Sequence, residues 1–245
     1  MKKIIIIPSR YGSSRFPGKP LALIKGKSMI QMVYENAKKA KGVDSIYVAT
    51  DDNRIRDCVI GFGGRALMTS ASHICGTDRV AECVELLGLN EDDLVLNIQG
   101  DEPMINSTMI EDLISIFDDE DVYMGTLSKK IEIESELHDP AVVKVISDVN
   151  GDAIYFSRYC IPYERDNRRT YHYKHIGVYG YKVSFLKKLS NMKKTDAELS
   201  ESLEQLRVLE AGYKIRVKET AFDSIGVDTP DHITMIEKIL SENEE

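Results

Sequence analysis

Cationic side chains gather directly after the most apolar segment of the chain, in a loop that is rich in small residues. The isoleucine run at 4–7 is followed by Arg10, Arg15 and Lys19, with serines and glycines between them. Backbone N–H groups in such a loop can approach an anion closely, and the cationic side chains can neutralise its oxygens. The pattern therefore favours a polyphosphate-binding site over a surface loop that is merely basic.

The loop does not match the common phosphate-binding motifs. A Walker A loop has four residues between its glycines and a Lys-Ser/Thr pair after them. Here five residues separate Gly12 from Gly18, and Pro20 follows Lys19. No GxGxxG sequence follows a predicted strand either. These differences argue against a P-loop kinase or ATPase. The loop is therefore expected to bind a triphosphate in a way that differs from the P-loop.

An aspartate, Asp101, lies one glycine beyond the apolar segment 93–99. A single carboxylate in such a place is ordinarily a helix cap or a turn residue, so Asp101 alone does not indicate a metal site. The five histidines show no HExxH or other paired metal spacing, and the four cysteines form no CxxC pair. A zinc site is therefore not expected, and the cysteines are predicted to be reduced thiols in a cytoplasmic protein.

The overall charge restricts the class of partner. The formal net charge of the chain is −8, which argues against a nucleic-acid polymer or an anionic membrane as partner. No apolar run reaches the length of a membrane span. A small anionic ligand at the local cationic loop remains the better interpretation.

The elements that must position these residues alternate between strands and helices in the first half of the chain. Short apolar runs predict buried strands at 3–7, 45–50, 65–69 and 93–99. Helical periodicity predicts helices at 29–41, capped by Ser28 and stopped at Gly42, and at 53–62, 77–88 and 107–117. This alternation predicts a mostly parallel sheet covered on both faces, with functional loops at the carboxyl ends of its strands.

Strand-like segments dominate the second half. They lie at 123–131, 141–148, 153–158, 175–181 and 213–220, and helices are predicted at 200–211 and from Pro230 to 242. We interpret the strands as additions to the sheet together with an arm for dimerisation within about 120–185. The 245 residues suffice for one large α/β domain, so a single domain spanning 1–245 is predicted.

Seven motifs along the chain give it a resemblance to a known family. They are IIPSRYGSSRFPGKPL, GTDR, QGDEPMI, YFSR, KHIGVYGY, ESLEQLR and GVDTPD. Together they resemble the 3-deoxy-manno-octulosonate cytidylyltransferases, or CMP-Kdo synthetases, from about residue 4 to 235. The resemblance implies an α/β, Rossmann-like nucleotide-diphospho-sugar transferase fold of the glycosyltransferase-A type, with three layers and a mostly parallel mixed sheet. It also implies CTP and Kdo as substrates, Mg²⁺ as cofactor, a homodimer, and a role in lipopolysaccharide or capsule biosynthesis.

The resemblance also implies roles for residues at the nucleotide end of the site. The catalytic set is Arg10, Arg15, Lys19 and Asp101. The nucleotide-binding set is Pro8, Ser9, Arg10, Gly12, Lys19, Ser72, His73, Gly76 and Asp101. The metal ligands are Asp101 and Asp228, and two carboxylates with phosphate oxygens and waters suit Mg²⁺. Cys75 departs from the family pattern, which has a serine there.

The sugar end of the site is implied in the same way. Kdo carries a carboxylate, which the planar guanidinium of Arg79 or Arg158 can match with two hydrogen bonds. His175 and Tyr179 are four residues apart and would share one face of a strand. The full sugar-binding set is Arg15, Arg79, Gln99, Arg158, His175, Tyr179, Glu204 and Gln205.

Three alternatives stay open at this point. The same fold is used by enzymes that act on an 8-amino-3,8-dideoxy analogue of Kdo. CMP-sialic acid synthetases have a similar N-terminal loop and also act on an acidic sugar. A catalytically silent nucleotide-binding module is the alternative outside enzymes. The presence of Arg10, Lys19, Asp101 and Asp228 argues against such a module, because binding alone needs no pair of metal carboxylates.

Overall fold

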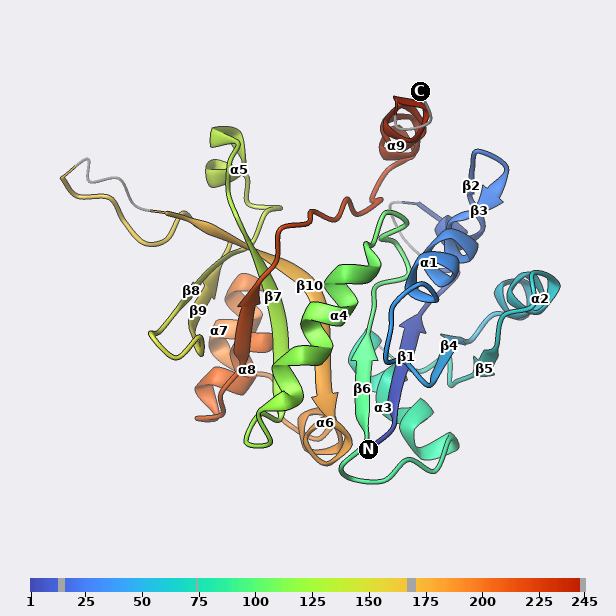
Figure 1. Ribbon diagram of the computed structural model, residues 1–245, viewed down its shortest axis with the longest axis horizontal. Coiled ribbons are helices and arrows are strands. Elements are labelled where there is room, and N and C mark those ends of the chain that lie inside the picture. Colours follow the sequence, from blue (N-terminus) through green and yellow to red (C-terminus); the bar gives the residue numbers. More distant parts are fainter. Residues whose placement is uncertain (13–15, 74, 167–170, 243–245) are drawn as a thin grey trace.

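The computed structural model describes residues 1–12, 16–73, 75–166 and 171–242. Within these ranges the main sheet contains nine strands (Figure 1). They are β1 (Lys3–Pro8), β4 (Ser45–Thr50), β5 (Ala66–Met68), β6 (Leu94–Asn97), β7 (Met124–Lys130), β8 (Lys144–Ser147), β9 (Ala153–Ser157), β10 (Tyr173–Lys182) and β11 (Arg216–Glu219). A small separate hairpin consists of β2 (Leu23–Ile24) and β3 (Lys27–Ser28).

Helices connect these strands. The α-helices are α1 (Met29–Ala37), α2 (Asn53–Gly61), α3 (Gly76–Leu86), α4 (Ser107–Ser115), α5 (Glu134–His138), α6 (Val183–Ser190), α7 (Asp196–Glu201), α8 (Gln205–Glu210) and α9 (Pro230–Glu242). Two short 3₁₀ helices are η1 (Lys19–Leu21) and η2 (Ile116–Asp118). None of the helices in the described ranges combines the length and apolarity needed to cross a membrane.

The prediction of a mostly parallel sheet is confirmed. The strand order is β11-β7-β10-β6-β1-β4-β5, and β8 and β9 extend the sheet beside β10. Along the main path only β10 runs antiparallel to its neighbours, β6 and β7, while the remaining pairs are parallel. The carboxyl ends of β1, β4 and β6 therefore lie at one edge, where ligands bind in open α/β sheets.

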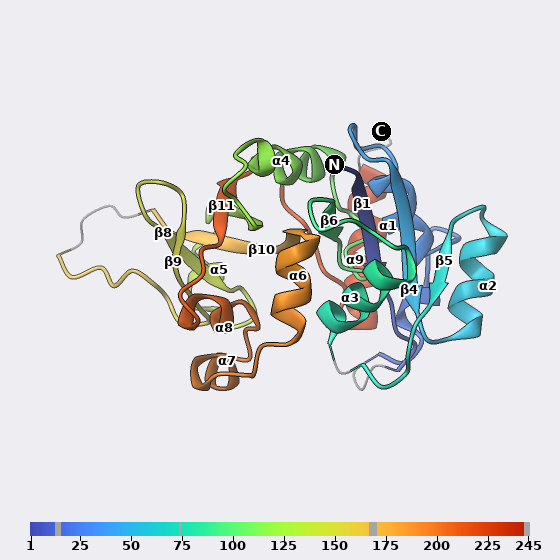
Figure 2. The same ribbon diagram turned by 90° about the horizontal axis from the view of Figure 1, so that it is seen from below.

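Helices cover both faces of the sheet, as the continuous isoleucine run of β1 requires. Ile5 and Ile7 pack in a core with residues of α1, α2 and α4. Ile4 and Ile6 pack on the opposite face with residues of α3, α6 and α8. Figure 2 shows α4 and α6 on opposite sides of β10. The result is a three-layer α/β arrangement.

The predicted continuous helix at 200–211 is wrong. The α7 helix ends at Glu201, and Ser202 takes the left-handed conformation with φ 52° before α8 begins at Gln205. This break lets Glu198 of α7 meet Arg207 of α8 in a buried ion pair, with nitrogen–oxygen distances of 2.7 Å and 2.6 Å. Periodicity cannot detect one left-handed residue, because both flanking turns remain amphipathic.

One irregular segment reaches the site edge from the far side of the sheet. Residues 221–229, here called the crossing segment, run from the end of β11 to the start of α9 without helix or strand (Figure 1). Ile236 of α9 and Val227 pack against Ile24 and Met29. The crossing segment thereby brings Asp228 to the carboxyl ends of the central strands.

Candidate active site

A cavity of about 250 Å³ opens at the carboxyl ends of β1 and β6. Its walls come from the loop after β1, the loop after β6, the start of α3 and the crossing segment. The lining residues are Pro8, Ser9, Arg10, Lys19, Pro20, His73, Cys75, Gly76, Arg79, Gln99, Gly100, Asp101 and Asp228. The structure thus brings together most of the residues assigned above to the nucleotide and the metal.

Lys19 stands between the two aspartates. Its Nζ lies 2.6 Å from Asp101 Oδ2 and 3.7 Å from Asp228 Oδ1, and it donates to the carbonyl oxygen of Val227 at 2.7 Å. Gly18, which precedes Lys19, has φ 72°, a conformation that turns the chain back into the cavity and that glycine adopts without strain. Two carboxylates from distant segments therefore face one point.

The chemistry of this pair fits a hard divalent cation. Carboxylate oxygens are the donors that Mg²⁺ prefers, and this ion keeps several waters or phosphate oxygens in its shell. In the described part of the chain, no group of three or more His, Cys, Asp or Glu side chains could hold a metal by itself. Asp101 and Asp228 would thus bind a cation together with a ligand that supplies further oxygens.

Close approach of two chain segments shapes the cavity floor. A Cβ placed on Gly100 would lie 2.9 Å from the carbonyl oxygen of Pro8, so the β1 and β6 ends can meet only with glycine at this position. The Oγ of Ser9 is buried and has no hydrogen-bond partner among the described residues. A buried hydroxyl without a partner is costly, and Ser9 is one of the residues that line the cavity.

The N-terminus of α3 forms another wall. Cys75 is its N-cap, and the Cys75 Sγ accepts from the backbone N–H of Asp78 at 3.4 Å. Burial and the nearby charge of Glu204 raise the pKa of the Cys75 thiol to about 12, so it is a neutral thiol at physiological pH. The unsatisfied N–H groups and dipole of a helix N-terminus favour an anion at Gly76.

Arg79 lines the cavity with its guanidinium already engaged. It is 3% exposed, and it donates to Thr69 Oγ1 at 2.5 Å and to Asp51 Oδ2 at 3.1 Å. Sequence reasoning did not single out Asp51 and Thr69, although both are polar residues directly after apolar strands. Their partnership fixes the direction in which Arg79 faces the site.

A second group of predicted residues lies beyond the start of α3. The rings of His175 and Tyr179 are 5.3 Å apart, and Glu204 accepts a hydrogen bond from Thr77 of α3. Burial lowers the pKa of His175 to about 3, and burial with the charge of Glu204 raises the pKa of Tyr179. Both rings are therefore neutral hydrogen-bonding groups. Gln99 links the two parts, donating to the carbonyl of Gly177 at 3.2 Å.

The structure does not bring Arg158 to this place. Arg158 lines a separate cavity of about 630 Å³ beside Glu201 and Cys160. Its guanidinium donates to the carbonyl oxygens of Glu201 at 2.7 Å and Pro140 at 2.8 Å. Within the described chain its side chain is thus held by the main chain, away from the cavity that contains Asp101.

The remaining predicted residues lie in different places. Arg15 lies outside the described residues. Gly12 and Ser72 are exposed and do not line the cavity, and Ser72 Oγ is 2.7 Å from Ser70 Oγ. Gln205 is buried at the start of α8. Ser72 and Gly12 therefore lie outside the lining of the cavity that contains Asp101.

Glu102 is a further residue that the sequence did not single out. Burial raises the pKa of Glu102 to about 7. The negative charges of Asp101 and Asp223 raise it further, while a hydrogen bond from Ser224 lowers it. Its neighbour in space is Gly177, whose Cβ position would lie 3.7 Å from Glu102 Oε1. A carboxyl therefore lies between the Asp101 loop, the crossing segment and β10.

A cation-lined cavity at the carboxyl ends of a mostly parallel sheet is where an α/β enzyme binds its ligand, and with two aspartates facing it the site suits a nucleotidyltransferase. The sequence model of the family described as cytidylyltransferase matches residues 4–215. The chain belongs to the cytidylyltransferase family.

Individual relatives cover nearly the whole chain. A 3-deoxy-manno-octulosonate cytidylyltransferase of Thermodesulfovibrio yellowstonii is 49% identical, over 98% of this chain and 99% of that protein. An 8-amino-3,8-dideoxy-manno-octulosonate cytidylyltransferase of Shewanella frigidimarina is 52% identical, over 97% and 98%. A structure of CMP:2-keto-3-deoxy-manno-octonic acid synthetase complexed with CTP has a TM-score of 0.94 and 42% identity, over 99% of this chain and 100% of that one.

Proposed function

We propose that this enzyme transfers CMP from CTP to the anomeric 2-hydroxyl of 3-deoxy-manno-octulosonate, giving CMP-Kdo and pyrophosphate. The observation that carries the proposal is the convergence of Lys19, Asp101 and Asp228 in one cavity. The names of the relatives at 49% and 42% identity support the same substrates. The product would serve lipopolysaccharide or capsule synthesis.

The reaction needs positioning and charge neutralisation more than covalent help. The hydroxyl oxygen of the sugar attacks the α-phosphorus while the bond to the pyrophosphate oxygen breaks. Arg10, Lys19 and the N-terminus of α3 neutralise the phosphate oxygens. Lys19 is held in place beforehand by Asp101 and the carbonyl oxygen of Val227. The segments at Pro8–Ser9 and 70–78 would hold the cytosine through backbone groups.

Mg²⁺ is proposed as the cofactor, held by Asp101 and Asp228. When bound, it would supply charge neutralisation at the α-phosphate and lower the pKa of the sugar hydroxyl. Lys19 contributes a fixed positive charge next to both carboxylates. Because two anionic substrates must approach each other, this concentration of cations is the physical basis of the proposal.

The sugar is proposed to lie between Gln99, His175, Tyr179 and Glu204. Neutral His175 and Tyr179 can hydrogen-bond sugar hydroxyls without adding charge. Arg79, held by Asp51 and Thr69, lines the cavity wall and is the guanidinium proposed to face the carboxylate of the sugar. Arg15 and Gln205 remain assigned to the sugar by resemblance alone.

A second candidate substrate is the 8-amino-3,8-dideoxy analogue of Kdo. The relative at 52% identity that bears this name favours it. The reaction and the residues would be the same, and the difference lies only in a hydroxyl or an amine at the far end of the sugar. A comparison of turnover with the two sugars decides between them.

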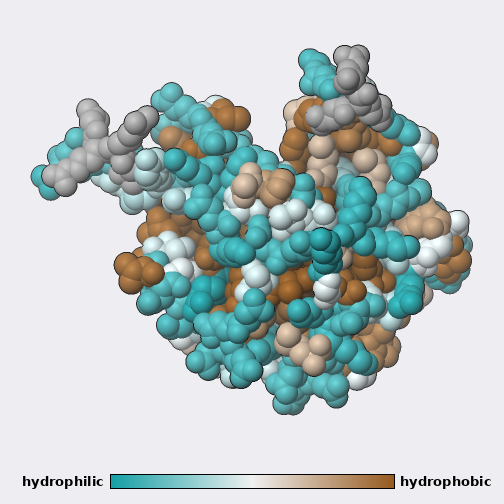
Figure 3. Space-filling model, in the orientation of Figure 1, coloured by the Kyte–Doolittle hydropathy of each residue, from teal (hydrophilic) through white to brown (hydrophobic). Residues whose placement is uncertain are grey.

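The arm that contains β8 and β9 is proposed as a homodimer surface, in a cytoplasmic enzyme that draws on the CTP pool. Exposed aromatic residues gather there, with Tyr159 79% and Tyr163 85% exposed. Figure 3 shows hydrophobic patches at the base of this arm and beside α9. Sedimentation of the purified chain tests this: a monomer at micromolar concentration would contradict it.

Pyrophosphate release tests the proposed function. The enzyme is supplied with each of the four NTPs, with and without Mg²⁺, and with Kdo, its 8-amino analogue or no sugar. Release that requires CTP, Mg²⁺ and one of the two sugars is expected. Release with a different nucleotide, or release that is unchanged by a chelator, would contradict the proposal.

A further inference from the structure

The crossing segment is held by a few isolated contacts, one of which is the main-chain hydrogen bond from Val227 N–H to the carbonyl oxygen of Asp101. It contains no helix or strand, so no ladder of backbone hydrogen bonds fixes it, and segments of that kind open readily unless they are tied down. Two of its contacts, from Gly226 and Asp228, reach His232 of α9. Three others, at Asp223, Ser224 and Val227, precede the cavity-lining Asp228. What holds these residues therefore also determines where Asp228 lies.

Asp223 makes the strongest of these contacts. Its Oδ2 lies 2.7 Å from Lys174 Nζ on β10 and 3.4 Å from Lys129 Nζ on β7. The side chain of Lys174 is only 10% exposed, and Glu136 of α5 approaches it at 2.6 Å from another side. A charged hydrogen bond in a half-buried place is stronger than a neutral one, so Asp223 is firmly attached to the sheet.

Ser224 makes a second contact, with the loop that carries the other aspartate. Its hydroxyl donates to Glu102 Oε2 at 2.7 Å, and Glu102 directly follows Asp101 in the chain. The two contacts tie the crossing segment to β10 on one side and to the Asp101 loop on the other.

We propose that Asp223 is a positioning residue for Asp228: its ion pair with Lys174 fixes the crossing segment so that the Asp228 carboxylate faces Asp101. Ser224 assists through Glu102. The inference rests on the proposed role of Asp228 in holding a divalent cation. Groups that orient metal ligands typically contribute 10–100-fold to metal affinity, so loss of the Asp223 charge should weaken cation binding by about tenfold or more.

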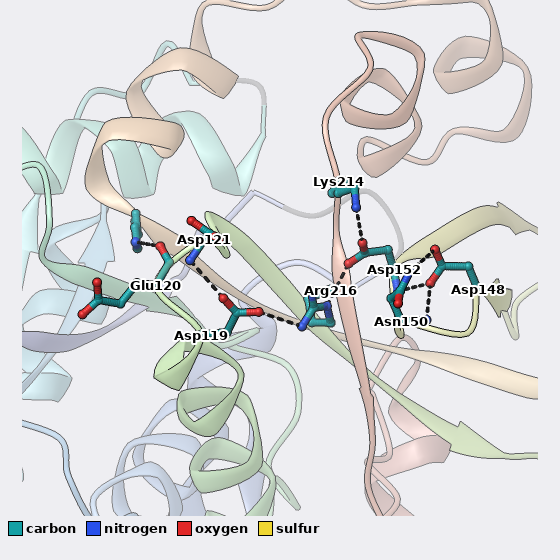
Figure 4. A network of polar contacts seen from close by, with 9 residues as sticks. Asp119, Glu120, Asp121, Asp148, Asn150, Asp152, Lys214 and Arg216 are labelled. Atoms are coloured by element: carbon teal, nitrogen blue, oxygen red, sulfur yellow. Dashed lines mark hydrogen bonds and ion pairs between the residues drawn. The ribbon is translucent and has the colours of Figure 1, made fainter.

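A matched control lies at the other end of β11. Asp152 is likewise an aspartate between two cations, with Lys214 Nζ and Arg216 Nε each at 2.8 Å (Figure 4). Its side chain is 7% exposed, against 38% for Asp223, so it is the more buried of the two. Asp152→Asn thus removes the same kind of interaction away from the cavity. It measures the general cost of breaking a buried ion pair in this fold.

The test measures Mn²⁺ and CTP binding without sugar, so that no turnover is involved. Enhancement of water-proton relaxation reports Mn²⁺ that is bound to the protein, and CTP is present at a fixed concentration. Asp223→Asn should raise the apparent dissociation constant of Mn²⁺ about tenfold, while Asp152→Asn leaves it unchanged. The double variant Asp223→Asn with Asp228→Asn should bind no more weakly than Asp228→Asn alone, because Asp223 acts through Asp228.

Each failure has a distinct meaning. If Asp228→Asn binds Mn²⁺ like the parent, the proposed metal role is wrong and the inference fails with it. If Asp228→Asn loses binding but Asp223→Asn does not, or if Asp152→Asn loses as much as Asp223→Asn, only the inference is wrong. Should Asp223→Asn fail to fold, Ser224→Ala takes its place, with a smaller increase in the dissociation constant expected and parental affinity contradicting the inference.

Discussion

The backbone N–H of Val227 donates to the carbonyl oxygen of Asp101 at 2.8 Å. This main-chain bond joins the crossing segment to the loop after β6 and brings Asp228 next to the Asp101 loop, while the Asp223–Lys174 ion pair ties the same segment to β10. Lys19 binds the same two segments through its ammonium group. The approach of the two aspartates therefore does not depend on their own side chains.

Lys19 is expected to contribute directly to turnover. Lys19→Gln removes the cation that lies 2.6 Å from Asp101, and loss of one such preorganised group typically lowers kcat by 10²–10³-fold. Pyrophosphate release with saturating CTP measures it. Lys27→Gln is the control, since Lys27 is exposed and pairs with Glu35. A Lys19 variant within about twofold of the parent would contradict the assigned role.

Gly100→Ala should destabilise the fold at the cavity floor. The new Cβ would lie 2.9 Å from the Pro8 carbonyl oxygen, a backbone atom that cannot move aside freely, and such overpacking costs about 1–3 kcal/mol. Urea unfolding measures the free energy of unfolding. Gly61→Ala, at the end of α2 with open space around it, should leave stability unchanged or raise it slightly. Equal stability of the two variants would refute the close approach of β1 and β6.

Cys75→Ser should retain activity and increase stability. Cys75 caps α3 through a weak sulfur acceptor, and a serine hydroxyl accepts the same bond better. A gain of about 0.5–1 kcal/mol is expected, seen as a higher melting temperature. Loss of turnover in this variant would mean that the thiol itself contacts the nucleotide.

His175 should make stability depend on pH. Its pKa in the folded protein is about 3, below the ordinary value of 6.5, because of burial. As the pH falls below 6.5, the unfolded chain binds a proton that the folded protein does not, so stability falls by up to about 1.4 kcal/mol per pH unit. His175→Gln removes this contribution. The free energies of unfolding of parent and variant should diverge between pH 7 and 5; parallel curves would be inconsistent with a buried neutral histidine.

Local signals in the sequence predicted the elements well. The helix capped by Ser28 is found as α1, with Ser28 Oγ accepting from Gln31 N–H at 3.4 Å, but it ends at Ala37 and not at residue 41 as predicted. The α9 helix begins at Pro230 as predicted. Cap residues and apolar periodicity act within a few residues, so the sequence reveals them directly. The residue pairs that line the cavity followed from the resemblance, because no local pattern relates Asp101 to Asp228.

What escaped the sequence depends on tertiary contacts. Ser202 interrupts the predicted helix so that Glu198 can reach Arg207. Apolar periodicity does not reveal this ion pair. Asp51 and Thr69 engage the Arg79 guanidinium, and the main chain holds Arg158 elsewhere. The sequence does not show which arginine reaches the cavity, because the partners that orient each guanidinium come from other segments of the chain.

A cation shared by two aspartates is the central claim. The most direct measurement is an anomalous difference map from crystals grown with CTP and Mn²⁺. One strong peak within coordination distance of carboxylate oxygens of both Asp101 and Asp228 is expected. A peak bound only by phosphate oxygens, or one elsewhere in the molecule, would contradict the account.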